Sequence, residues 1–291
     1  MKKARNVQDE DLSILKNQSL LVSGDEIKWI GNLKKLPQAF KRQISEEISL
    51  KNKTVMPSFV ECHTHSVFSG SRSHEFELRN QGVSYQEIAA KGGGILSTQK
   101  SLNKTPEKEL LQLTQTRIDK FIQQGVSVVE VKSGYGLDFP NEVKSLRILK
   151  KIKKAHIVPT FLGAHAIPKK YQSETQYLEF LMKKVLPQVK KERLADRVDI
   201  FIEKGFFSKE ASKKYLKFCQ EMDFKITIHA DQLSLSGGTE LACEMQALSA
   251  DHVIQLSSKE IKRISKSEVT GVLLPLADLY MKCPYPPARK L

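Results

Sequence analysis

The sequence predicts an α/β fold, a parallel barrel preceded by a small β module, and three observations support this. From Thr54 onward, short apolar runs alternate with longer amphipathic segments rich in Lys and Glu, a pattern typical of strand–helix units in a parallel sheet. The length of 291 residues suits one large domain with a small appendage, because α/β barrels reach about 250 residues as a single domain. No Gly-x-Gly-x-x-Gly motif follows any strand, which favours a barrel over a dinucleotide-binding sheet.

The first 54 residues differ from the rest of the chain. Ser19–Ser23 and Ile27–Ile30 are short strand-like runs on either side of the turn signal Gly24-Asp25, which predicts a β-hairpin. We therefore expect residues 1–54 to form the N-terminal part of a small β-sandwich module. Residues 55–291 are expected to form the barrel domain.

Seven strands are predicted in the barrel domain, with helical segments between most of them. A closed barrel of this kind needs eight strands. The expected fold is therefore a (β/α)8 TIM-like barrel that lacks the eighth strand and is incomplete at the C-terminus. The predicted strands are Val55–Val60, Val126–Lys132, Ile157–Leu162, Val198–Ile202, Lys225–His229, Ala247–His252 and Gly271–Leu274, and the clearest helices are Pro106–Gln123, Glu142–Lys154 and Thr175–Lys191.

Composition and charge exclude several classes of protein. Hydrophobic residues make up 40% and charged residues 27%, which is typical of a globular protein and not of a disordered or collagen-like one. No apolar run reaches the length of a membrane span, and no apolar segment follows the basic N-terminus, so we expect a cytoplasmic protein without a membrane partner. Of the 47 basic residues behind the net charge of +14, 37 are Lys and spread along the chain. Because phosphate recognition favours Arg, this excess indicates a solvated surface and no nucleic-acid partner.

The four cysteines lack a Cys-x-x-Cys spacing and are expected to be free thiols.

Histidines provide the sharpest functional signal. His63 and His65 follow the first predicted strand, and side chains at positions i and i+2 of an extended segment point to the same side. Such a pair could bind one metal ion, although an isolated pair is more often part of a surface loop. His165, His229 and His252 lie at the ends of three further strands. Since the carboxyl ends of barrel strands form the active-site face, this placement favours a metal site.

Two other residues have chemistry suited to a small ligand. Arg72, in a short loop after His65, could hold a carboxylate in a bidentate pair, or could be an ordinary surface arginine. Tyr135, in a loop flanked by glycines, could donate a hydrogen bond to a ligand or pack beneath the loop. Gly92-Gly93-Gly94 lacks the phosphate-binding pattern, and we expect a flexible loop near the barrel mouth.

Longer blocks of sequence resemble a known family. The first strand and its motif, Met56–His65, are similar to the opening strand of amidohydrolase-superfamily enzymes. Further blocks narrow the resemblance to the imidazolonepropionase family, with a match from about Ser19 to the C-terminus. These blocks are Phe68–Arg72, Gly92–Thr98, Glu130–Leu137, Phe161–His165, His229–Leu233 and Leu248–His252.

The resemblance implies a function and a set of site residues. It implies hydrolysis of the cyclic amide of 4-imidazolone-5-propanoate to N-formimidoyl-L-glutamate in histidine degradation, with one Zn or Fe ion, in a possible homodimer. Where Gln232 stands, some family members carry Glu, so His252 would carry more of the proton transfer. Lys132 is interpreted as structural, because the family is mononuclear. The implied metal ligands are His63, His65 and His229, the implied substrate-binding residues are Arg72, Tyr135, His165 and Gln232, and the implied catalytic residues are His252 and Gln232.

The sequence also departs from the family pattern. The family's fourth metal ligand is an Asp at the end of an eighth strand, and here Asp278 is the only Asp after His252 and is expected in the loop after the seventh strand. We therefore expect the 291-residue chain alone to be weakly stable and poorly active. The alternatives are a truncated inactive homologue, a related hydrolase or deaminase acting on another small heterocycle, and a nucleic-acid binder suggested by charge alone.

Overall fold

The computed structural model describes residues 9–291, which divide into two compact units, one up to Met56 and the other Pro57–Leu291. In the first unit β1 (Ser19–Ser23) pairs with β2 (Glu26–Gly31) in antiparallel fashion. Gly24, at the turn, has a φ of +61°, a conformation that glycine adopts without steric cost. The predicted hairpin is confirmed, and one short helix, α1 (Gln38–Lys41), follows it.

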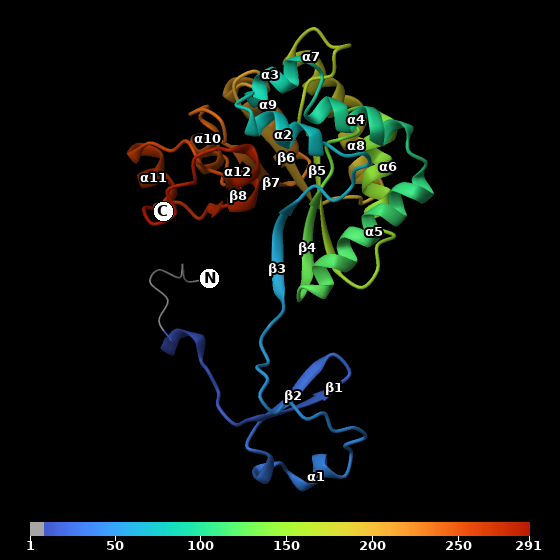
Figure 1. The fold of residues 1–291 in the computed structure, drawn as a ribbon, viewed down its shortest axis with the longest axis vertical. Coiled ribbons are helices and arrows are strands. Elements are labelled where there is room, and N and C mark those ends of the chain that lie inside the picture. Colours follow the sequence, from blue (N-terminus) through green and yellow to red (C-terminus); the bar gives the residue numbers. More distant parts are fainter. Residues whose placement is uncertain (1–8) are drawn as a thin grey trace. The chain divides into compact units, whose positions relative to one another are not determined.

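The second unit is built on a seven-stranded parallel sheet whose spatial order equals the chain order. The strands lie side by side in the centre of this unit, and the helices surround them (Figure 1). Within the described residues, the first and the last strand each pair with one neighbour only, so these two are the edges of a nearly closed barrel. The strands are β3 (Phe59–Thr64), β4 (Val126–Lys132), β5 (His156–Ala164), β6 (Arg197–Ile202), β7 (Lys225–Ala230), β8 (Ser249–His252) and β9 (Thr270–Val272).

Helices follow the strands as the alternating pattern predicts. The predicted helix 175–191 is one continuous helical stretch. It contains a π-helical segment, Leu181–Val185, shortly before Pro187. None of the helices in residues 9–291 is both long and apolar enough to cross a membrane. The helices are α2 (Ser73–Asn80), α3 (Tyr85–Ala90), α4 (Ile95–Lys104), α5 (Glu107–Gln123), α6 (Phe139–Leu149), α7 (Glu174–Phe180), α8 (Leu186–Lys191), α9 (Lys209–Glu221), α10 (Gly238–Glu244), α11 (Ser258–Ile264) and α12 (Pro275–Met281).

Burial explains why these segments form a barrel. In β6 the five residues Val198–Ile202 are all buried, as expected for a strand covered by helices on one face and by the barrel interior on the other. On α5 the buried residues Leu110, Thr114 and Ile118 recur every four positions and form one stripe towards the sheet. The predicted fold class, a TIM-like barrel with seven strands and a small N-terminal β module, is confirmed.

The prediction for the first barrel strand was wrong by about four residues. Val55 and Met56 are exposed, and Pro57 has no backbone N–H to donate to a neighbouring strand. Pairing begins at Phe59, whose N–H donates to the carbonyl of Gly125 at 2.9 Å. As a result His63 lies within β3, not after it, and the strand itself sets the direction of its side chain.

Candidate metal centre

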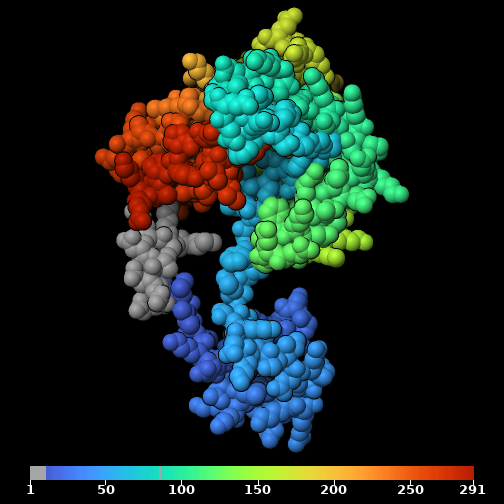
Figure 2. All heavy atoms as spheres, viewed as in Figure 1, coloured from blue at the N-terminus to red at the C-terminus, as the bar shows by residue number. Residues whose placement is uncertain are grey.

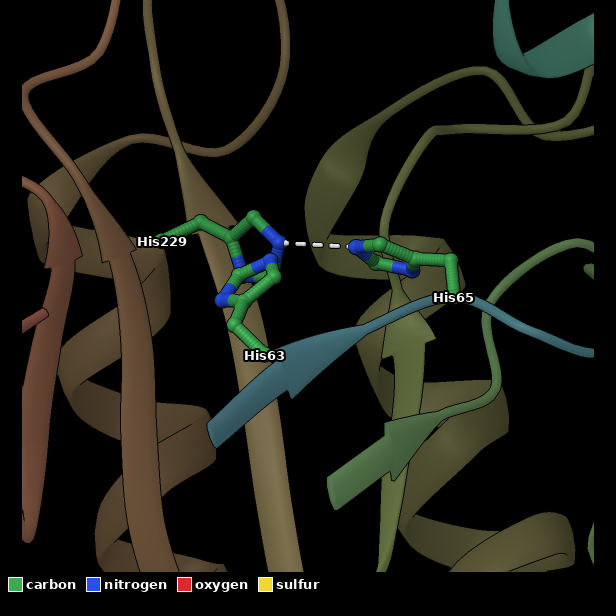
Figure 3. Close-up of side chains that lie close together, drawn as sticks. All are labelled: His63, His65 and His229. Atoms are coloured by element: carbon green, nitrogen blue, oxygen red, sulfur yellow. Dashed lines mark hydrogen bonds between the residues drawn. The ribbon is translucent and has the colours of Figure 1, made fainter. Parts of the chain in front are cut away.

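Three histidines from two strands lie close enough together to bind one ion. His63 is the fifth residue of β3, His65 follows the end of that strand, and His229 lies near the carboxyl end of β7. One ring nitrogen from each lies within 4.8 Å of the others. Figure 3 shows the rings turned towards one another, with 3.3 Å between Nε2 of His65 and Nε2 of His229. The structure thus brings together the three residues for which metal binding was implied.

The other two strand-end histidines adjoin this group. The ring of His165, at the end of β5, stacks on His65 with 5.0 Å between the centroids and 10° between the planes. His252, the last residue of β8, has its ring centroid 5.2 Å from those of His63 and His229. The backbone φ of His252 is +74°, a conformation that residues other than glycine rarely adopt. Conformations of this kind concentrate at functional sites, so the occurrence of one here agrees with a working role for His252.

Burial keeps the imidazoles of His63, His65, His165 and His252 neutral. It lowers the pKa of His63, His65 and His252 well below the ordinary value, and the repulsion that a protonated imidazole would meet from Lys132 or a neighbouring protonated imidazole lowers it further. The pKa of His165 falls to about 3 for the same reason. A neutral imidazole has one N–H and one lone pair, and the lone pair is what a metal ion requires.

Hydrogen bonds select which nitrogen has the lone pair. Nδ1 of His63 lies 2.6 Å from the carboxylate of Asp251, and Nδ1 of His229 lies 3.0 Å from that of Asp199. A carboxylate only accepts, so each Nδ1 donates its hydrogen and each Nε2 keeps its lone pair. The buried Nδ1 of His65, a half-buried residue, has no hydrogen-bond partner among the described residues. Three imidazoles are a donor set typical of zinc and related transition metals, so these residues fit a metal ion.

A cavity of about 290 Å³ opens over the histidines. All the residues implied by the resemblance as ligands, substrate contacts or catalytic groups line it, although they come from six separate places in the sequence. A second cavity of about 380 Å³, lined by several serines, shares Arg72 and Tyr135 with the first. The implied residues on the wall of the first cavity are His63, His65, Arg72, Tyr135, His165, His229, Gln232 and His252.

Arg72 stands at the wall of both cavities, immediately before α2. Its side chain is 26% exposed, and its Nε lies 4.0 Å from a carboxylate oxygen of Glu75. Its backbone carbonyl accepts a hydrogen bond of 3.2 Å from the hydroxyl of Tyr280. The guanidinium is therefore placed at the cavity by contacts that leave part of it accessible to a ligand.

Tyr280, on α12, is a cavity residue that sequence reasoning missed. Its ring stacks on Phe76 with 5.3 Å between centroids, and the guanidinium carbon of Arg79 lies 4.2 Å from the centre of the ring. The C-terminal segment, red in Figure 2, lies against the teal residues of the α2 region. The contact between the rings of Phe76 and Tyr280 could not be recognised in the sequence, because the two residues lie on helices about 200 positions apart.

Asp278 is not in a loop, as the sequence predicted, but on α12 (Pro275–Met281). Pro275 at the start of the segment suits the first turn of a helix, and this explains the difference. Burial raises the pKa of Asp278 to about 6, and neither of its carboxylate oxygens has a hydrogen-bond partner among the described residues. It does not line the cavity of the histidines.

Relatives that match this chain over most of its length are imidazolonepropionases. No family model matches the sequence. The chain is 53% identical over 291 residues to an imidazolonepropionase of Bdellovibrio bacteriovorus, covering 100% of this chain and 69% of that protein. It is 40% identical over 285 residues to an imidazolonepropionase of Clostridium tetani, covering 97% and 68%. The chain therefore spans somewhat more than two thirds of the length of these relatives.

Solved structures support the fold at lower identity. A guanine deaminase from C. acetobutylicum superposes with a TM-score of 0.66 at 14% identity, over 94% of this chain and 66% of the other. A 5-methylcytosine deaminase from Klebsiella pneumoniae gives 0.67 at 15% identity, over 91% and 64%. At such low identity the likeness shows the barrel architecture alone.

Proposed function

The chain belongs to the imidazolonepropionase family, and from this premise we propose that it hydrolyses the cyclic amide of 4-imidazolone-5-propanoate to N-formimidoyl-L-glutamate in histidine degradation. Family membership makes it a hydrolase that acts on a carbon–nitrogen bond. The observation that supports the specific reaction best is the single cavity lined by the histidines, Arg72, Tyr135 and Gln232.

In this proposal His63, His65 and His229 hold one Zn or Fe ion. When bound, such an ion supplies Lewis acidity, which activates water and polarises a carbonyl group. The chain's part is to present three imidazoles, two of them with the Nδ1 hydrogen donated to a carboxylate. Their lone pairs are then available to the ion without any deprotonation step.

Arg72 and Tyr135 bind the carboxylate tail of the substrate. The planar guanidinium of Arg72 matches a carboxylate through two parallel hydrogen bonds. Burial raises the pKa of Tyr135, so its hydroxyl stays protonated and can donate a hydrogen bond. Both residues line both cavities. They therefore select a ring with an acidic tail over a neutral heterocycle.

His165 and Gln232 hold the ring. The Nδ1 of His165 donates to the carbonyl of Gly134 at 3.0 Å, which leaves its Nε2 as an acceptor. That acceptor suits an N–H group of the imidazolone, and the amide of Gln232 can both donate and accept. Their role is orientation of the carbon–nitrogen bond that breaks.

His252 transfers the proton that the reaction needs. Hydrolysis of an amide takes a proton from water and gives one to the departing nitrogen. Nδ1 of His252 is buried and has no hydrogen-bond partner among the described residues. As a neutral imidazole it can accept the proton as a base and return it to the ring nitrogen as an acid.

Turnover with matched substrates tests the proposal. The purified chain is loaded with Zn²⁺ or Fe²⁺ and assayed with 4-imidazolone-5-propanoate and with a ring that lacks the propanoate. We expect metal-dependent hydrolysis of the first compound only, and a large loss of this preference in Arg72→Met. A chain that binds metal but neither hydrolyses nor binds 4-imidazolone-5-propanoate contradicts the proposal. Hydrolysis of both rings at equal rates would indicate the related hydrolase of another heterocycle.

The remaining expectations about partners stay predictions. A homodimer is checked by light scattering of the purified chain. The absence of a nucleic-acid partner is checked by retention on DNA and RNA at low salt, where a genuine partner is held and then released as salt rises.

A further inference from the structure

A fully buried lysine lies beneath the histidines. Lys132, the last residue of β4, has no exposed surface. Its ammonium nitrogen contacts oxygen atoms from four strands. The contacts are Asp199 Oδ2 at 2.9 Å on β6, Glu130 Oε1 at 3.1 Å on β4, Asp251 Oδ2 at 3.2 Å on β8 and Thr227 Oγ1 at 3.3 Å on β7.

Two of these contacts are shared with candidate metal ligands. The Oδ2 atom of Asp251 that contacts Lys132 also accepts from Nδ1 of His63 at 2.6 Å. The Oδ2 atom of Asp199 likewise accepts from Nδ1 of His229 at 3.0 Å. A second bond holds Asp199 in place, because its Oδ1 accepts from the backbone N–H of His229 at 3.1 Å.

We propose that Lys132 is the positioning residue of the metal centre: its ammonium holds Asp199 and Asp251 where each accepts the Nδ1 hydrogen of one histidine, so that Nε2 of His229 and His63 face the metal ion. This inference rests on the proposed metal site. It assigns to Lys132 an action through two carboxylates and no contact with substrate.

The chemistry of lysine suits this task. An ammonium group has three hydrogens that can point in three directions, and here one cation serves two aspartates on β6 and β8. Burial opposes the charge of Lys132, but the carboxylates of Asp199, Asp251 and Glu130 outweigh it and raise its pKa. Without the ammonium, Asp199 and Asp251 would be two buried like charges with less support, and at least one would turn away from its histidine or become protonated.

The network of Lys132 and the two aspartates does not orient His65. Nδ1 of His65 has no hydrogen-bond partner among the described residues, and no carboxylate of the network touches it. Lys132 therefore orients two of the three ligands. Loss of Lys132 should weaken the site and leave its third ligand in place, so a graded loss of affinity is expected and not an abolished site.

Metal affinity measured by chelator competition tests the inference. Apo-protein is titrated with Co²⁺ in the parent chain and in Lys132→Met, whose side chain has a similar length and no charge. We expect affinity to fall about 10- to 100-fold, the usual effect of losing a group behind a metal ligand. The matched control is Lys144→Met, because Lys144 donates to the backbone carbonyls of Leu102 and Thr105 and should keep parent affinity.

A double-variant comparison separates positioning from a general loss of structure. If Lys132 acts through Asp251, the loss in Lys132→Met combined with Asp251→Asn is smaller than the product of the two single losses. Losses that simply multiply overturn the inference. So does a folded Lys132→Met variant that binds Co²⁺ as the parent does. If Lys132→Met does not fold, Lys132→Gln, which also removes the positive charge, decides by the same criteria.

The proposed site is tested separately from the role of Lys132. Parent affinity for Co²⁺ in His229→Ala would overturn the metal site itself, and the inference with it. Loss of binding in His229→Ala together with parent affinity in folded Lys132→Met would overturn the inference alone.

Discussion

The floor of the cavity and its wall are built from different elements. The floor consists of the histidines His63, His65 and His229 with Lys132 and the two aspartates beneath them, all on strands or directly after one. The wall consists of Arg72, Tyr135 and Tyr280, which stand on loops and helices. The floor is buried and held by short polar contacts, whereas Arg72 on the wall keeps part of its side chain exposed.

This difference indicates that the floor and the wall have different functions. Ligands on strands are held by the hydrogen bonds of the sheet, which gives the fixed geometry that a metal ion needs. Residues on loops can vary without disturbing the barrel, so they suit recognition of a particular substrate. Changes in the floor should thus affect metal binding and rate, and changes in the wall should affect substrate affinity.

The largest effect is expected from removal of a floor ligand. His229→Ala should abolish stoichiometric metal binding and lower kcat/KM by about 1000-fold or more, since Lewis-acid catalysis contributes several kcal/mol. Metal content and turnover are measured together. The control is His156→Ala, because His156 is exposed at the start of β5. Equal losses in the two variants would contradict the assignment of the floor.

His252→Ala should separate chemistry from metal binding. We expect kcat to fall about 100- to 10,000-fold, the usual contribution of a general acid or base, while metal content stays stoichiometric. Activity is followed across pH with metal content measured in each sample. Loss of metal in proportion to activity would show that His252 belongs to the ligands and not to proton transfer.

A change in the wall should act on substrate binding. Arg72→Met removes a charge-assisted pair worth about 1.5–3 kcal/mol, so KM should rise about 10- to 100-fold with metal affinity unchanged. Steady-state kinetics with 4-imidazolone-5-propanoate check this. Arg147→Met, which removes an exposed arginine paired with Glu192, is the control. An unchanged KM in Arg72→Met would show that Arg72 does not bind the substrate.

The smallest effect is expected for Tyr280→Phe. It removes only the hydroxyl that donates to the carbonyl of Arg72 at 3.2 Å, a bond worth about 0.5–1.5 kcal/mol. KM should therefore rise a few-fold, and the exposed Tyr285→Phe should leave it unchanged. A rise in KM as large as that of Arg72→Met would show that the ring, and not the hydroxyl bond, places the arginine.

Local sequence patterns predicted the fold because the barrel is built from local units. The bounds of β4 agree with the predicted strand Val126–Lys132, since an apolar run there ends at a glycine-flanked loop. The start of β3 was misplaced because Val55 and Met56 are apolar yet lie before Pro57, where pairing cannot begin. Apolar character alone did not show where the strand finds its neighbour.

The site was predictable where chemistry and strand position coincide, and not where it depends on distant contacts. Histidines at strand ends could be recognised from one sequence. The bond between His63 and Asp251 joins residues 188 positions apart, and Lys132 was interpreted as merely structural. A charged residue within an apolar strand run, such as Asp199 in Val198–Ile202, was the available signal for the network beneath the histidines.

Three imidazole nitrogens are proposed to form the metal centre, and X-ray absorption of the zinc-loaded chain can identify the atoms that bind the ion. The structure predicts a first shell with nitrogen scatterers at about 2.0–2.1 Å and the multiple-scattering pattern of three imidazoles. A shell containing sulfur at about 2.3 Å, which the neighbouring Cys62 would supply, or one with no imidazole pattern, would contradict it.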